Sequence, residues 1–204
     1  MAKVSLDRST LEAADLPPYP GIAQSDITLV TTTETAASAH ERLMNVDAIG
    51  FDTESKPTFL KGEVSTGPHL VQLATDGHAW LFPTSVTAAI PLLREILESP
   101  RVLKVGFGLG NDRSSLQARF GIALANVFDL GEALRGPGHR GTVGAKMAVA
   151  HFFGQRLQKS KKVGTSNWAS PRLNERQIHY AANDAHVAIR LYRAWKTATE
   201  QAAP

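Results

Sequence analysis

One short stretch, Ile49-Gly50-Phe51-Asp52-Thr53-Glu54-Ser55, constrains the fold of this chain more than any other. The apolar residues that lead into it predict a buried strand over 46–51, and that strand ends in two carboxylates. Side chains alternate between the faces of a strand, so Asp52 and Glu54 are expected to point the same way, about 7 Å apart along the chain. Two carboxylates that converge at the end of a buried strand repel each other unless a cation lies between them. The pair is therefore either a charged strand end that opens into a solvated loop or part of a cation site.

Composition limits the classes of protein to which the chain can belong. Its 204 residues are 43% hydrophobic and 20% charged, which is typical of a single globular domain with one well-formed core. No apolar run approaches the roughly eighteen residues that span a bilayer, and the first residues lack the apolar segment of a signal peptide, so no membrane partner is expected. The absence of cysteine excludes disulfides, thiolate nucleophiles and Cys-ligated zinc, and it fits a cytoplasmic location.

Basic residues gather in one part of the chain. Between Leu134 and Gln177 the sequence has nine Lys or Arg against the single acid Glu175, although the whole chain carries a net charge of only +3. A cationic segment attached to an acidic remainder suggests a polyanion track beside a carboxylate site. The alternative is an ordinary solvated surface rich in lysine.

The order of the predicted elements indicates an α/β domain. Residues 1–26 contain a proline-rich run and little periodicity, so we expect an extended N-terminal arm, followed by a single domain over 27–204. Strands are expected at 27–30, 46–51, 70–74, 79–82, 101–105 and 126–130, with a hairpin turn at Asp76-Gly77. Helices are expected at 35–44, 88–97, 113–120, 142–153 and 174–196, with a basic loop over 155–172. This order predicts a mixed five- or six-stranded sheet with helices on both faces.

Two further acidic residues fall at predicted helix positions. Asp112 lies where a glycine-rich turn enters a helix, a place where Asp commonly caps the first turn. Asp184 lies within the last helix, with alanines at positions 181, 182, 185 and 188, which indicates a packed face rather than an exposed one. A carboxylate on such a face needs a partner. Because no Lys or Arg lies nearby on that face, a metal ion is a good candidate.

A tyrosine shares the helix face of Asp184. Tyr180 lies four residues earlier, and at 3.6 residues per turn the two differ by about 40° around the helix. His179 differs from Asp184 by about 140° and is expected to point away. Considered alone, a tyrosine on an amphipathic helix more often belongs to the core than to a catalytic site.

Three motifs, in this order, resemble the exonuclease motifs of the DEDD superfamily of 3′–5′ exonucleases. They are Phe51-Asp52-Thr53-Glu54, Val105-Gly106-Phe107-Gly108-Leu109-Gly110-Asn111-Asp112 and Tyr180-Ala181-Ala182-Asn183-Asp184. The connecting segments 70–75, 144–146, 166–168 and 173–177 are also similar to the exonuclease domains of ribonuclease D and Werner-type proteins. The resemblance covers residues 27–196. It implies a ribonuclease H-like fold and the hydrolysis of single-stranded or 3′-recessed DNA or RNA from the 3′ end, with release of nucleoside 5′-monophosphates.

The resemblance also implies a cofactor and roles for the acidic residues. Asp52, Glu54, Asp112 and Asp184 would hold two divalent cations, Mg²⁺ or Mn²⁺, because carboxylate oxygens suit these hard ions far better than zinc. Asp52 would bridge both ions, with Glu54 and Asp184 on the nucleophile side and Asp112 completing the site through water. Two such ions, about 3.5–4 Å apart, stabilise the attacking and leaving oxygens and lower the pKa of a bound water.

The third motif satisfies both subclasses of the superfamily, Tyr-x-x-x-Asp and His-x-x-x-x-Asp. The helical geometry and the flanking segments favour Tyr180 over His179. With an ordinary pKa of about 10, a tyrosine is a poor base at neutral pH, so Tyr180 is expected to orient the attacking water.

The basic segment would then bind the substrate. The residues expected to contact nucleic acid are Thr53, Arg156, Lys159, Lys161, Lys162 and Trp168. The four basic residues lie between the second and third motifs and would contact phosphates without reading sequence. Trp168 either stacks on a base or anchors the loop.

Two other functions are open alternatives. Gly106-x-Gly108-x-Gly110, followed by Asp129, is similar to the dinucleotide-binding fingerprint of oxidoreductases, but its third glycine comes after two positions rather than three. A non-catalytic nucleic-acid-binding module of the same fold is the second alternative, and the retention of every expected ligand argues against it. The sequence leaves DNA and RNA equally open as substrates and indicates no oligomeric state.

Overall fold

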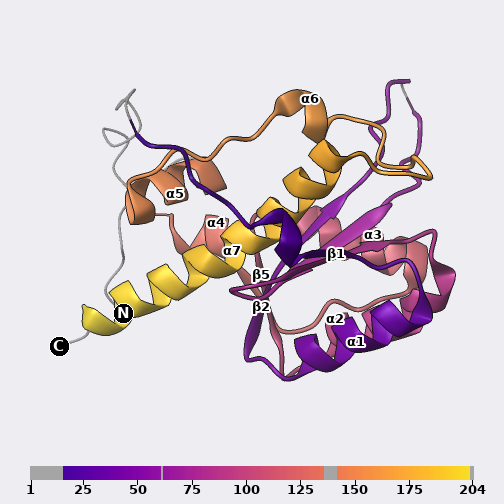
Figure 1. Cartoon of the computed structure of the whole chain (residues 1–204), viewed down its shortest axis with the longest axis horizontal. Helices are drawn as coiled ribbons and strands as arrows, with labels where there is room; N and C mark the ends of the chain where they lie inside the picture. Colours follow the sequence, from indigo (N-terminus) through magenta and orange to yellow (C-terminus); the bar gives the residue numbers. More distant parts are fainter. Residues whose placement is uncertain (1–15, 61, 136–141, 203–204) are drawn as a thin grey trace.

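A mixed six-stranded sheet forms the centre of the molecule (Figure 1). The computed structural model describes residues 16–60, 62–135 and 142–202. The strands are β1 (Ile27–Leu29), β2 (Ala48–Glu54), β3 (Leu70–Ala74), β4 (Ala79–Pro83), β5 (Leu103–Gly106) and β6 (Val127–Asp129). Their spatial order is β1-β4-β3-β2-β5-β6. β3 runs antiparallel to β2 and β4, and the other neighbouring pairs are parallel, so the expected mixed sheet is confirmed.

Helices cover both faces of this sheet, as predicted. They are α1 (Thr33–Met44), α2 (Ile90–Glu98), α3 (Gly110–Phe120), α4 (Leu130–Ala133), α5 (Ala145–Phe153), α6 (Lys161–Gly164) and α7 (Glu175–Gln201), with the short 3-10 helices η2 (Gln24–Asp26) and η3 (Thr87–Ala89). In Figure 1, α1 and α2 lie together on one side of the sheet, whereas α7 crosses the other side with α5 near its middle. None of the helices in the described ranges combines the length and the hydropathy that a membrane crossing requires.

Each face of the sheet has its own apolar core, and the period of two along the strands decides which residue enters which core. In β3, Leu70 and Ala74 pack with the alanines of α7, whereas Val71 and Leu73 pack with α1 and α2. All five residues of β3 are buried. A strand that is covered on both faces therefore carries almost no exposed side chain.

α7 lies against β2 almost backbone to backbone. A Cβ atom placed on Gly50 would overlap the carbonyl oxygen of Ala185, so only glycine fits this position of the strand. The small alanine side chains of α7 permit the same close approach. Asp184 precedes Ala185 and Asp52 follows Gly50 by two residues, so this contact brings the two acids to the same place.

The expected elements are present, but several boundaries differ by three residues or more: β2 continues to Glu54, α3 begins at Gly110 and α7 continues to Gln201. The predicted N-cap of the last helix is confirmed: Gln177 donates its backbone N–H to Asn174 Oδ1 at 3.0 Å, and Asn174 donates to Gln177 Oε1 at 3.1 Å. The helix expected at 142–153 begins only at 145, because Gly144 has an extended N-cap conformation. The segment expected to be a loop at 155–172 contains α6, whose first turn is capped by the Ser160 hydroxyl.

The N-terminal arm is described only in part. Residues 16–23 have no regular element except an isolated parallel bridge between Pro18 and Arg156. Residues 24–26 form η2, so the expected extended arm ends before residue 26. The part of this prediction that concerns residues 1–15 lies outside the described residues.

Candidate active site

Asp52 and Glu54 extend from the same face of β2, as the period of two predicts. In the antiparallel register Asp52 lies opposite Gln72 and Glu54 lies opposite Leu70. Leu70 belongs to the core beneath α7, so this face of β2 is directed towards α7. The two carboxylates therefore lie on the side of the sheet that carries Asp184.

The electrostatics show that the four acids lie near one another. Burial raises the pKa of Asp52 well above its usual range, and the negative charges of Asp184 and Asp112 raise it further. Burial likewise raises the pKa of Glu54 to about 9, with additional contributions from Asp52 and Asp184. Burial and mutual repulsion make these carboxylates hard to ionise together, and nearby positive charge opposes the rise in pKa, as Lys159 does for Asp52 and Glu54. The arrangement therefore favours a bound cation.

Asp184 has a basic partner that the helix pattern did not reveal. It is only 6% exposed, and its Oδ2 atom lies 2.8 Å from Nζ of Lys159. Burial lowers the pKa of Lys159, but the attraction of Asp184 and Asp52 outweighs this effect and holds the pKa above its ordinary value. The expectation that no basic residue lies near Asp184 was wrong, because Lys159 reaches it from the segment between α5 and α6 rather than along the helix.

Asp112 lies in the first turn of α3 and faces β2. It accepts a hydrogen bond from the hydroxyl of Thr53, the residue between the two acids of β2. Burial raises the pKa of Asp112, and this hydrogen bond partly offsets the increase. Asp112 is not the helix cap, because Leu109 occupies that position.

Asp129, at the end of β6, holds the turn that places Asp112. Its Oδ2 accepts from the backbone N–H of Leu109 at 2.9 Å, and its Oδ1 accepts from Gly108 at 3.1 Å and from Gly131 at 2.8 Å. The Asp129 carboxylate is therefore bound to backbone groups of the protein itself. In a dinucleotide-binding fingerprint, the corresponding acid binds a ribose of the cofactor. Sequence reasoning assigned no positioning role to this residue, although an acid inside the short apolar strand expected at 126–130 was a usable signal.

The donor set suits a hard divalent cation, but its present conformation is not that of a metal centre. Among the residues that the structure describes, no three acidic or imidazole side chains converge at the spacing a metal ion requires. Asp112 faces the Thr53 hydroxyl, and Asp184 faces the Lys159 ammonium. The buried Oδ2 of Asp184 contacts that ammonium but has no well-directed hydrogen bond. The four carboxylates are hard oxygen donors whose charges together raise the pKa of Asp52 and Glu54, so they fit a divalent cation that would replace the ammonium.

Tyr180 lies on the same side of α7 as Asp184, whereas His179 does not. A Cβ atom placed on Gly164 would lie 2.7 Å from Oη of Tyr180, so the tyrosine hydroxyl sits against the α6 backbone. Burial raises the pKa of Tyr180, and Asp184 raises it further, which makes it a still weaker base. His179 is exposed and pairs with the side chain of Asn183 at 3.0 Å.

The residues expected to bind nucleic acid fall into three groups. Thr53 and Lys159 are bonded to Asp112 and Asp184. Arg156, Lys161 and Lys162 are exposed, as a phosphate contact requires. Trp168 is only 2% exposed and donates from Nε1 to the carbonyl of Gly164 at 3.1 Å, which supports the alternative that it anchors the loop.

Some exposed apolar residues escaped the sequence analysis. Phe59, Leu60 and Val64 are 81%, 77% and 83% exposed on the connection between β2 and β3. Apolar residues inside an otherwise polar loop, a few positions after Glu54, were the signal that could have identified them. A cavity of about 360 Å³ also borders Asp52 and Asp184, and its walls include Phe107, Lys146 and Lys159.

The chain is similar in sequence to several known proteins. A family model described as 3′–5′ exonuclease matches residues 27–199. The bifunctional 3′–5′ exonuclease/ATP-dependent helicase WRN of Mus musculus is 29% identical over 157 residues, which are 74% of this chain and 11% of that protein. Ribonuclease D of Gluconacetobacter diazotrophicus is 32% identical over 163 residues, which are 78% of this chain and 39% of that protein.

A solved structure supports the fold. The Nibbler EXO domain of Aedes aegypti superposes with a TM-score of 0.74 at 24% identity, covering 89% of this chain and 92% of that domain. The expected ribonuclease H-like fold is thereby confirmed. The first three curated relatives are longer proteins, since the chain spans only 11%, 17% and 52% of their lengths.

Proposed function

The chain belongs to the 3′–5′ exonuclease family, and we propose that it hydrolyses the terminal phosphodiester bond at the 3′ end of a nucleic acid strand with divalent cations. The observation that carries this proposal is the meeting of four acids from three elements, β2, α3 and α7. Their mutual effect on the pKa of Asp52 and Glu54 supports it, because such a cluster needs positive charge to stay ionised.

The proposed domain is 27–204, and its acids would act as a set. Asp52, Glu54, Asp112 and Asp184 would hold two ions, Mg²⁺ or Mn²⁺. Bound cations of this type neutralise charge on the phosphate and make a water acidic enough to attack it. To bind the ions, Asp112 would break its hydrogen bond with the Thr53 hydroxyl, and Asp184 would break its ion pair with Lys159. The released hydroxyl and ammonium would then face the substrate.

Tyr180 would position the attacking water rather than remove its proton. The raised pKa of its hydroxyl makes proton abstraction at neutral pH unfavourable, whereas the neutral hydroxyl can donate one hydrogen bond and accept another. Lys159 would contact the scissile phosphate once it leaves Asp184. Exposed Arg156, Lys161 and Lys162 would contact phosphates further along the strand.

A digestion of matched strands tests the proposal. DNA and RNA oligonucleotides of the same sequence, labelled at the 5′ end, are incubated separately with Mg²⁺, Mn²⁺ or EDTA. We expect a descending ladder of labelled products with at least one of the metals and none in EDTA. Release of the label as a mononucleotide, or equal hydrolysis in EDTA, would contradict the proposal. Comparison of the two polymers identifies the preferred substrate.

A further inference from the structure

The arm segment Leu16–Gln24 is fixed to the protein through the basic segment and α7. The backbone of Arg156 is bound on both sides, since its N–H donates to Pro17 at 2.8 Å and its carbonyl accepts from Tyr19 at 3.0 Å. Ile22 is buried, and its N–H donates to Oδ1 of Asn183 on α7 at 2.9 Å. These contacts link the arm to a segment that carries Lys159 only three residues after Arg156.

The docked arm borders an open cavity of about 1180 Å³, which lies between the arm, α5, the segment 156–163 and the first turns of α7. Its basic lining residues are Lys146, Arg156, Lys159, Lys162 and Arg176, and its acidic ones are Glu175 and Asp184. Asp184 is already paired with Lys159, so the remaining lining is strongly cationic. Tyr19 and Tyr180 add aromatic surface.

The size and the charge of the cavity indicate its occupant. Sites for small molecules usually have volumes of about 300–1,000 Å³, and this cavity is larger. Several basic side chains along one cavity can neutralise successive phosphates of a nucleic acid strand, whereas a single small anion needs fewer basic partners. The cavity also reaches Asp184 and Tyr180, so a chain lying in it would arrive at the acidic cluster.

We propose that the arm segment Leu16–Gln24 is part of the nucleic-acid site, where it closes this cavity around the sugar-phosphate chain of the bound strand. The inference rests on the proposed function and extends it to residues that precede the family match, which begins at residue 27. The arm acts in two ways: it forms one wall, and it holds Arg156 and the segment leading to Lys159 in place.

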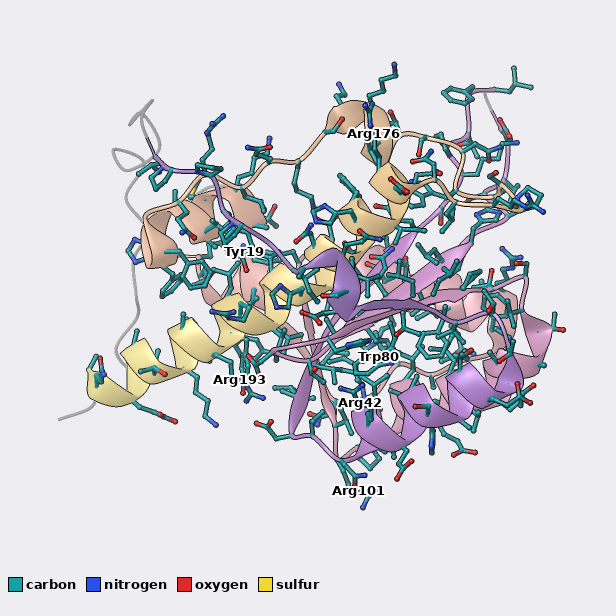
Figure 2. The ribbon with its side chains drawn as sticks, in the orientation of Figure 1. Tyr19, Arg42, Trp80, Arg101, Arg176 and Arg193 are labelled. Atoms are coloured by element: carbon teal, nitrogen blue, oxygen red, sulfur yellow. The ribbon has the colours of Figure 1, made fainter. Side chains whose placement is uncertain are left out.

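The first test compares two exposed arginines that Figure 2 shows at opposite ends of the view, Arg176 at the start of α7 and Arg101 before β5. Binding of a 5′-fluorescein-labelled single strand is followed by anisotropy in EDTA, so that hydrolysis does not interfere. Arg176→Gln should raise Kd on the order of fivefold and reduce the slope of log Kd against log salt by about 1. Arg101→Gln should leave both values unchanged. Equal binding by the two variants would overturn the inference.

The second test lifts the arm without removing a charge. A Cβ atom on Gly21, whose φ is +70°, would overlap Oδ1 of Asn183, so Gly21→Ala should displace this side chain and break its hydrogen bond with Ile22, which loosens the arm from α7. Gly77→Ala is the matched control, because a Cβ atom there meets nothing within 4 Å. We expect Gly21→Ala to raise Kd and KM several-fold with kcat changed less than about twofold. A fall in kcat at constant KM would contradict the binding role.

Activity measurements separate this inference from the function on which it rests. Wild-type protein that degrades the strand, together with Arg176→Gln and Gly21→Ala variants that bind it as tightly as wild type, would overturn the inference alone. Wild-type protein that binds the strand through these residues but never hydrolyses it would overturn the proposed function. Thermal unfolding of each variant shows whether Gly21→Ala remains folded, and Arg176→Gln tests the cavity in either case.

Discussion

At the scale of single residues, Asp184 connects the fold, the charge cluster and the basic segment. It is buried against β2, and its carboxylate forms an ion pair with the ammonium group of Lys159. The same carboxylate oxygens are expected to hold a divalent cation. An ammonium ion and a metal ion cannot occupy one position, so Lys159 and the metal compete for Asp184.

This competition predicts the behaviour of Lys159→Gln. Without the ammonium, Asp184 is free to bind a cation, so the dissociation constant for Mn²⁺, measured by titration calorimetry without substrate, should fall by at least about threefold. Lys161→Gln is the control, because Lys161 is exposed at the start of α6. If Lys159→Gln binds Mn²⁺ as weakly as the control or more weakly, the ion pair does not oppose metal binding.

At the scale of elements, the contact between α7 and β2 sets the distance between the acids. The helix approaches so closely because Gly50 and the alanines of α7 carry almost no side chain. The strand alternation, the hairpin at Asp76-Gly77 and the N-cap of α7 were predictable, since each depends on residues close in sequence. The Asp184–Lys159 pair and the bonds of Asp129 to the turn before α3 were not predicted, because they join residues at least twenty positions apart.

The close contact between α7 and β2 predicts that a single added methyl group has a large effect on stability. Gly50→Ala should lower the free energy of unfolding by about 3 kcal/mol or more, because the new Cβ atom overlaps a backbone carbonyl that cannot move alone. Chemical denaturation followed by circular dichroism measures this change. Gly77→Ala, in open space, should change the free energy of unfolding by less than about 1 kcal/mol. Similar values for the two variants would show that α7 can move away from β2 at little cost.

At the scale of the whole molecule, the candidate site makes the metal-free protein sensitive to pH. The motifs allowed the set of acids to be predicted from the sequence, but their raised pKa values depend on burial and on distances that only the folded chain defines. The folded protein holds the Glu54 proton up to about pH 9, whereas the unfolded chain releases it near 4.5. Unfolding between these values therefore releases a proton.

The sign of the pH dependence follows from this proton release. In EDTA, the contribution of Glu54 to the free energy of unfolding should become less favourable as the pH rises from about 4.5 towards about 9. Glu54→Gln removes the titration, so its stability relative to wild type should increase over this range. Denaturation at pH 5, 7 and 8.5 measures the difference, and a pH-independent difference would contradict the raised pKa of Glu54.

The most direct test of the account is the rate at which Asp52→Asn protein degrades a 5′-labelled strand in Mn²⁺, compared with wild type. The substitution preserves the shape of the side chain and removes the charge at the centre of the cluster. We expect the rate to fall by about a thousandfold or more, while the circular dichroism spectrum stays that of wild type. Hydrolysis at the wild-type rate by Asp52→Asn protein free of host nuclease would show that these acids are not the catalytic site.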